Sequence, residues 1–191
     1  IRLSEMVEEA VERHRALLIR SGIRVDIQGT ACISTGDIGE SMESVVYTDD
    51  KWAVFILGQL LQNGARYRRG ESGGSAGENT PVIELSAKLP ESTPANQPGK
   101  MPETGLPSGQ RANAPVIELQ AKQLGKQVQL VVRDNGIGIP AHELPRVFDR
   151  GFTGSNGRAR GGSTGIGLYL CRRLADCLEI GLQIASKEGE G

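Results

Sequence analysis

The apolar run QVQLVV ends just before Asp134, which opens the stretch DNGIGIP. Its β-branched residues predict a strand, and Gly136 and Gly138 let the backbone turn tightly and approach a ligand closely. Asp134 therefore stands at the carboxyl end of a strand, where sheet proteins often hold ligands. Gly136, Gly138 and Ala141 also match a dinucleotide-binding loop, but Pro140 interrupts the helix that such a loop needs.

Length and composition limit what this stretch can mean. The chain has 191 residues, of which 38% are hydrophobic, and this is enough for one domain with a core. Lys and Arg number 22 against 23 Asp and Glu, so we expect no nucleic-acid partner and no membrane contact. We expect Cys32, Cys171 and Cys177 to be reduced thiols in the cytoplasm, because their number and spacing suit neither a disulfide framework nor a metal site.

Hydrophobic residues at helical spacing predict two amphipathic helices, at residues 3–19 and 51–68. The first is expected to open at Ser4, and the second to be capped by Asp49 or Asp50. The second helix has an unusual feature, because two amides lie along its apolar stripe.

These amides are Gln59 and Asn63, one helical turn apart. An unsatisfied buried amide costs about 1–3 kcal/mol, so each must find a partner. A hydrogen bond to a neighbouring strand would satisfy Asn63. Two inward amides followed by the sequence ARYRR favour a binding site instead.

Alternation of apolar and polar residues predicts a strand at residues 23–27 and a shorter one at 44–48. Residues 70–114 are rich in Gly, Pro and Ser and read as a loop or linker. A repeated sequence starts within this stretch: the first copy, NTPVIELSAK, begins at Asn79, and the second, NAPVIELQAK, begins at Asn113. We expect the second copy to form a hairpin with QVQLVV, and the first copy to be either a further strand or a loop excursion.

A last amphipathic helix is predicted after the sequence GGSTGIGL, with Ser163 or Thr164 as its cap. Gly165 and Gly167 at its start would expose backbone N–H groups, and a helix N-terminus favours an anion such as phosphate. The glycines are equally compatible with relief of crowding at the helix entrance. The Gly-, Ser- and Arg-rich residues before the helix look mobile.

Four motifs now stand in a fixed order: LGQLLQNGARY, DNGIGI, VFDRGF and STGIGL. This set resembles the N box, first glycine box, F box and second glycine box of the ATP-binding domain shared by sensor histidine kinases, DNA gyrase and heat-shock chaperone ATPases, the GHKL or Bergerat fold. The match covers nearly the whole chain. DRGFTGSNGR followed by STGIGLYL is most similar to the antimicrobial-peptide-sensing, intramembrane-sensing histidine kinases.

The resemblance implies an α+β fold, a two-layer sandwich in which about three helices cover one face of a mixed, mostly antiparallel sheet and leave the other face largely open. It implies that residues 1–191 form one ATP-binding catalytic domain, with 70–114 as an insertion. It also implies a further strand beyond "SKEGEG", the end of this sequence.

The resemblance also assigns roles. Asp134 would accept a hydrogen bond from the adenine amino group, Asn63 would bind Mg²⁺, Arg66 would contact phosphate and Tyr67 would pack on base or ribose. Residues 149–162 would form a lid over ATP. The other residues implied at the nucleotide are Gly136, Gly138, Ile139, Phe148, Thr153, Ser163, Thr164, Gly165, Ile166, Gly167 and Leu168.

Gln59 separates two chemistries. ATP-hydrolysing members of the superfamily carry a glutamate four residues before the metal-binding asparagine, where it acts as a general base on water. An amide cannot take that proton. Gln59 therefore favours phosphoryl transfer to a protein over hydrolysis.

The phosphoacceptor motif of histidine kinases is absent, and we do not expect either histidine, His14 or His142, to replace it. The resemblance therefore implies a separate dimerisation domain that carries the acceptor histidine, a membrane-anchored sensor part and a response regulator. This fragment alone would be inactive in autophosphorylation. Two alternatives stay open: a nucleotide-binding pseudokinase that acts by interaction, and a serine kinase of the anti-sigma type.

Overall fold

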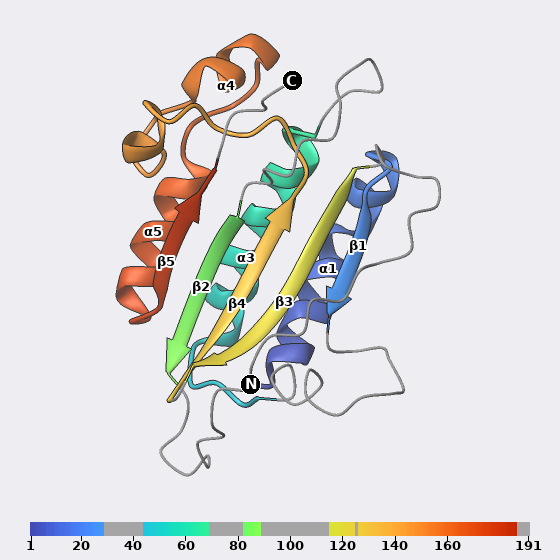
Figure 1. Ribbon diagram of the computed structural model, residues 1–191, viewed down its shortest axis with the longest axis vertical. Coiled ribbons are helices and arrows are strands. Elements are labelled where there is room, and N and C mark those ends of the chain that lie inside the picture. Colours follow the sequence, from blue (N-terminus) through green and yellow to red (C-terminus); the bar gives the residue numbers. More distant parts are fainter. Residues whose placement is uncertain (29–43, 69–81, 89–114, 125, 187–191) are drawn as a thin grey trace, which may run out of the picture.

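The computed structural model describes residues 1–28, 44–68, 82–88, 115–124 and 126–186. They form one five-stranded mixed sheet in the order β1-β3-β4-β2-β5, with three helices packed on one of its faces (Figure 1). A short fourth helix, α4, lies beyond the end of the sheet. The elements are α1 (Leu3–Arg20), β1 (Arg24–Gln28), α3 (Asp50–Arg66), β2 (Val82–Lys88), β3 (Val116–Leu124), β4 (Gln127–Asp134), the 3-10 turn η1 (Leu144–Arg146), α4 (Gly154–Arg160), α5 (Gly167–Cys177) and β5 (Gly181–Ala185).

The predicted α+β, two-layer fold is confirmed. Only the β1–β3 pair is parallel, and the β3–β4, β2–β4 and β2–β5 pairs are antiparallel. Side chains of β3 and β4 alternate between the core and the open face, because successive residues of a strand point to opposite sides. Helices α1, α3 and α5 supply the apolar layer that covers the core face of the sheet, opposite the open face.

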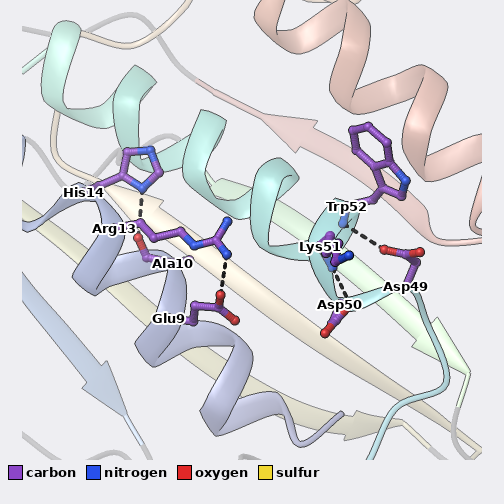
Figure 2. Close-up of polar contacts among 8 residues, drawn as sticks. All are labelled: Glu9, Ala10, Arg13, His14, Asp49, Asp50, Lys51 and Trp52. Atoms are coloured by element: carbon purple, nitrogen blue, oxygen red, sulfur yellow. Dashed lines mark hydrogen bonds and ion pairs between the residues drawn. The ribbon is translucent and has the colours of Figure 1, made fainter.

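The first predicted helix is confirmed to within one residue at its end. The residue predicted to open the helix, Ser4, is wrong, because Arg2 occupies the N-cap position and Ser4 lies inside the first turn. The second helix has the predicted cap: Asp49 accepts a hydrogen bond of 3.2 Å from the backbone N–H of Trp52 (Figure 2). This helix ends at Arg66, before the predicted 68.

The strand predicted at residues 44–48 is wrong. The described part of this segment makes one isolated antiparallel bridge, between Arg2 and Val45. Backbone hydrogen bonds from Leu3 N to Ser44 O and from Val46 N to Ile1 O, 3.0 and 2.9 Å long, tie it to the start of the chain. The segment therefore pairs with a helix entrance rather than with the main sheet.

The repeat has a definite place in the sheet. The second copy, in β3, forms the predicted hairpin with β4, and the first copy is a strand, β2, on the other side of β4. Ile117 pairs with Asp134, whereas the equivalent Ile83 pairs with Val132. The two registers differ by two residues, and an even shift keeps equivalent repeat positions on the same face of the sheet.

The core lies between the sheet and the three helices, and α3 contributes most to it. Its fully buried side chains include Ile56, Leu57, Leu60 and Leu61. Two of the predicted thiols, Cys171 and Cys177, are free, and Cys32 lies outside the described residues. Within the described ranges, no helix combines the length and apolarity needed to cross a bilayer.

His14 joins α1 to α3. Its Nδ1 lies 2.9 Å from the carbonyl oxygen of Ala10 (Figure 2), and its Nε2 lies 2.9 Å from Nε2 of Gln62. Because a carbonyl only accepts, Nδ1 carries the proton and Nε2 accepts from the Gln62 amide. The imidazole lies against Gly58 of α3, where a Cβ atom would overlap the ring.

This contact reverses the usual effect of alanine at a helix glycine. Gly→Ala inside a helix ordinarily stabilises by about 1 kcal/mol, but we expect Gly58→Ala to destabilise the fold by about 1–3 kcal/mol, because the new methyl must displace a hydrogen-bonded ring. Urea unfolding measures the change. In a His14→Ala background the same substitution should regain its stabilising sign, and equal destabilisation in both backgrounds would contradict this packing.

Candidate nucleotide-binding site

A cavity of about 960 Å³ opens at the carboxyl end of β4. It lies between the end of α3, the segment that contains α4 and the start of α5, at the upper end of the sheet in Figure 1. Thirteen residues predicted for a nucleotide site line it: Gln59, Asn63, Arg66, Tyr67, Asp134, Gly138, Ile139, Thr153, Ser163, Thr164, Gly165, Gly167 and Leu168.

The last two turns of α3 form one wall. At Gly64 this helix packs tightly on the sheet, since a Cβ there would lie 2.7 Å from Cδ1 of Ile117 and 3.6 Å from Cβ of Asp134. The neighbouring Asn63 and, one turn earlier, Gln59 are half-buried and line the cavity. The amides that the sequence placed along the apolar stripe thus face a solvent-accessible hollow beside Asp134.

Asp134 lies where β4 ends, and its Oδ1 accepts a 2.8 Å hydrogen bond from the backbone N–H of Gly136. Burial raises the pKa of this carboxyl from 3.8 to about 6, although the Gly136 hydrogen bond opposes the shift. Gly136 itself is covered, because a Cβ there would meet Asp134 Oδ1 and the carbonyl oxygen of Tyr67. Ile137 N–H donates to that same carbonyl at 2.9 Å, which fixes the glycine turn to the end of α3.

Ser163 connects this wall to the entrance of α5. Its hydroxyl lies 2.9 Å from an Arg66 guanidinium nitrogen, which donates to it, and 3.0 Å from the Tyr67 hydroxyl. The prediction that Ser163 or Thr164 caps α5 is wrong, because the N-cap residue is Ile166 and the cap has no side-chain hydrogen bond. The serine instead binds side chains almost a hundred positions earlier in the sequence.

The start of α5 closes the far side of the cavity. Gly165 has φ of +65° and packs directly on the backbone of Phe152, so a side chain there would be both strained and blocked. Gly167 faces Gln59, whose Oε1 would lie 2.7 Å from a Cβ at that position. Both glycines line the cavity, beside the polar end of α3.

The predicted lid, residues 149–162, contains the helix α4. A 2.9 Å hydrogen bond from Gly151 N–H to Gly165 O joins the start of this segment to the residues that follow it. Two contacts hold α4 to the loop after β4: Ser155 N–H donates to Glu143 at 2.8 Å, and Asn156 Nδ2 lies 3.4 Å from Gly138 O. The part of the lid predicted to be mobile is thus helical and anchored.

Three predicted residues are not on the cavity wall. Gly136 lies beneath it, Phe148 packs against the core, and Ile166 is 41% exposed. Phe152 lines the cavity instead, with the Arg146 guanidinium 4.7 Å from its ring centre.

Several other lining residues were not predicted from the sequence. Among them are Leu17, Arg20 and Ser21 at the end of α1, and also Gln62 and Glu143. Only contacts between distant segments bring these side chains to the cavity, so periodicity could not have identified them. Of these five residues, only Gln62 belongs to one of the four motifs, the N-box sequence.

The described residues contain no cluster of three or more His, Cys, Asp or Glu side chains that could hold a metal ion by themselves. The oxygen donors that line the cavity include the amide of Asn63. A single amide oxygen fits Mg²⁺, which usually keeps several waters and binds together with substrate phosphates.

Residues 48–191 match the family described as histidine kinase-, DNA gyrase B- and HSP90-like ATPase. The chain is similar over its full length to the sensor histidine kinase YxdK and the sensor protein BceS of Bacillus subtilis, at 27% and 28% identity. It covers 42% and 40% of those two proteins. Over 81% of its length it is 28% identical to the sensor protein kinase GraS of Staphylococcus aureus, of which it covers 32%.

The fold is similar to the nucleotide-free catalytic domain of histidine kinase ThkA, with a TM-score of 0.53 and 16% identity over 93% of this chain and 80% of that one. This likeness confirms the predicted Bergerat fold. Since the family match covers three quarters of the sequence and includes all four motifs, the chain belongs to the family of histidine kinase-, DNA gyrase B- and HSP90-like ATPases, as the sequence predicted.

Proposed function

We propose that this chain is the catalytic domain of a sensor histidine kinase, which binds Mg-ATP and donates the γ-phosphoryl group to a histidine. The observation that carries the proposal is the meeting of Asn63, Asp134 and the start of α5 at one cavity. The chain spans about two fifths of the length of YxdK and BceS. We therefore assign the acceptor histidine, on a dimerisation domain, to the full-length protein.

Asp134 is proposed to select adenine. One carboxylate oxygen is held by the Gly136 N–H, and the other can accept a hydrogen bond from the adenine amino group. Guanine has a carbonyl at the corresponding position, and two acceptors would face each other. Gly138 and Ile139 line the same end of the cavity and would contact the base.

Asn63 and Arg66 are proposed to act on the triphosphate. The Asn63 oxygen would bind Mg²⁺, which supplies charge neutralisation between the phosphates when bound. Arg66 would donate to phosphate oxygens, and charge-assisted hydrogen bonds of this kind are about twice as strong as neutral ones. The N–H groups around Gly165 and Gly167 would bind the remaining phosphate oxygens.

Gln59 is proposed to keep water from competing with the acceptor histidine. It lies between Asn63 and Gly167, next to the proposed phosphate position. An amide can orient a group by hydrogen bonding but cannot remove a proton from water. Transfer to a protein is therefore favoured over hydrolysis.

The remaining partners follow from the sensor kinases to which the chain is similar. We propose a membrane-anchored full-length protein with this domain in the cytoplasm, and a response regulator that receives the phosphoryl group. The likeness to BceS and GraS supports the antimicrobial-peptide-sensing group suggested by the motifs.

The adenine assignment predicts that Asp134→Asn loses nucleotide. The amide would turn an NH₂ donor toward the adenine amino group, so we expect affinity for a non-hydrolysable ATP analogue to fall at least about tenfold. Isothermal titration calorimetry measures it, with wild-type binding in the micromolar range or weaker and dependent on Mg²⁺. Asp26→Asn, at a strand aspartate outside the cavity, is the matched control. Equal affinity of wild type and Asp134→Asn would remove the assignment.

The raised pKa of Asp134 predicts a cost in stability. Between pH 4 and 6 the folded state binds more protons than the unfolded state, so the contribution of Asp134 to stability decreases as pH rises through this range. Above pH 6 the full cost of the buried charge, up to about 3 kcal/mol, is present. Without nucleotide, Asp134→Asn should therefore be more stable than wild type at pH 7 and equal to it near pH 3.5, as measured by chemical unfolding. A difference that does not change with pH would contradict a buried, ionised Asp134.

The role of Gln59 can be tested in the full-length protein. Wild type incubated with γ-labelled ATP should form an acid-labile phosphohistidine with little free phosphate. We expect Gln59→Glu to release free phosphate several-fold faster, because its carboxylate can act as general base, while Gln62→Glu, one helical turn away, does not. An acid-stable product would favour the serine-kinase alternative, and binding without any product would favour the pseudokinase.

A further inference from the structure

Glu143 is the one charged side chain that is buried among the described residues, with 7% of its surface exposed. It lies in the loop between the glycine turn and the F-box sequence, and it lines the cavity without belonging to any of the four motifs. A buried carboxylate is costly unless it is hydrogen-bonded, so its partners indicate what it does.

Its hydrogen-bond donor belongs to the first turn of α4, and the exposed His142 ring lies 4.0 Å from Oε1. Oε1 accepts the 2.8 Å hydrogen bond from the backbone N–H of Ser155, 12 residues later in the chain. Oε2 lies against Gly154, where a Cβ would come within 2.5 Å of it. The N-cap residue of α4, Thr153, makes no side-chain cap. Glu143, which lies outside the helix, therefore accepts the hydrogen bond that an N-cap side chain would normally accept.

The helix needs such a contact. Seven residues are too few for a helix that is stable in water by itself, and a negative charge at the N-terminus is favourable to the helix dipole. The next residue, Asn156, reaches the carbonyl of Gly138. The first turn of α4 is thus bound on one side to Glu143 and on the other to the turn that follows Asp134.

We propose that Glu143 is a positioning residue, whose carboxylate holds the lid helix α4 over the nucleotide cavity and so slows release of the nucleotide. The part of this inference that concerns nucleotide release rests on the proposed ATP-binding function, whereas the part that concerns the position of α4 does not. In the absence of any ligand, Glu143 determines whether α4 stays formed.

The test compares Glu143→Ala with Glu143→Gln in hydrogen–deuterium exchange without nucleotide. We expect amides at residues 155–160 to exchange about tenfold faster in Glu143→Ala, because the Ser155 N–H loses its charge-assisted partner. Glu143→Gln keeps an acceptor oxygen and should stay within about threefold of wild type. His142→Ala removes an exposed imidazole that lies 4.0 Å from Glu143 Oε1 but leaves the Ser155 hydrogen bond in place, so it should exchange as wild type does.

A second pair of variants approaches the contact from the helix. Gly154 and Gly161 have φ of +61° and +66°, so alanine is strained at both, but only Gly154 lies against Glu143. Gly154→Ala should therefore loosen α4 several-fold more than Gly161→Ala does. In the Glu143→Ala background this difference should disappear, since the crowded oxygen is gone. A difference that persists there would contradict the contact.

Nucleotide release completes the test. A fluorescent ATP analogue should dissociate about tenfold faster from Glu143→Ala and near the wild-type rate from Glu143→Gln, with association rates unchanged. Wild-type exchange in the α4 amides of Glu143→Ala would overturn the proposal, and so would faster exchange with unchanged release. Failure of wild type to bind the analogue would instead overturn the proposed function, while the exchange result would stand.

Discussion

The close approach of α3 to the ends of β3 and β4 is the constraint on which the site depends. It requires Gly64, because any side chain there would strike Ile117, and Gly136, because a side chain would strike the Tyr67 carbonyl. The Ile137 N–H bond to that carbonyl then locks the turn to the helix. With these contacts in place, Asn63 and Asp134 open onto one hollow. A methyl group at either glycine would therefore push the two walls apart, and at Gly136 it would also displace the Asp134 carboxylate.

The sheet behind this junction is assembled around β4. Both copies of the repeated PVIEL segment pair with β4, one on each side, in registers that differ by two residues. Because an odd shift would have turned the equivalent positions to the opposite face, the same sequence can serve on both sides only with an even shift. β4 is therefore a central strand, and the carboxylate at its end lies inside the protein rather than at an exposed edge. This central position explains why burial raises the pKa of Asp134.

Local patterns sufficed for much of this architecture. The stripe from Leu3 to Leu18 predicted α1, Asp49 or Asp50 was expected at the start of α3, and the β-branched run QVQLVV predicted β4, because each signal depends on residues within a few positions of one another. The four motifs predicted many of the residues that line the cavity, but not all of them. Contacts across long stretches of sequence were not predictable. Periodicity could not tell a strand from a loop for β2, could not place Ser163 against Arg66 and Tyr67 rather than on α5, and gave no reason to single out Glu143.

These long-range contacts share a property that bears on ligand binding. In the structure Arg66 and Tyr67 both bind the Ser163 hydroxyl, a neutral partner at the C-terminal end of the lid. A phosphate oxygen is a stronger acceptor for a guanidinium than a hydroxyl is, so a bound triphosphate would compete for Arg66 at little cost. The N-terminal end of the lid helix is held differently, by a buried carboxylate that a triphosphate would repel rather than replace. The two sides of the proposed lid are therefore held differently: the contact at Ser163 would exchange partners on nucleotide binding, and the contact at Glu143 would stay in place.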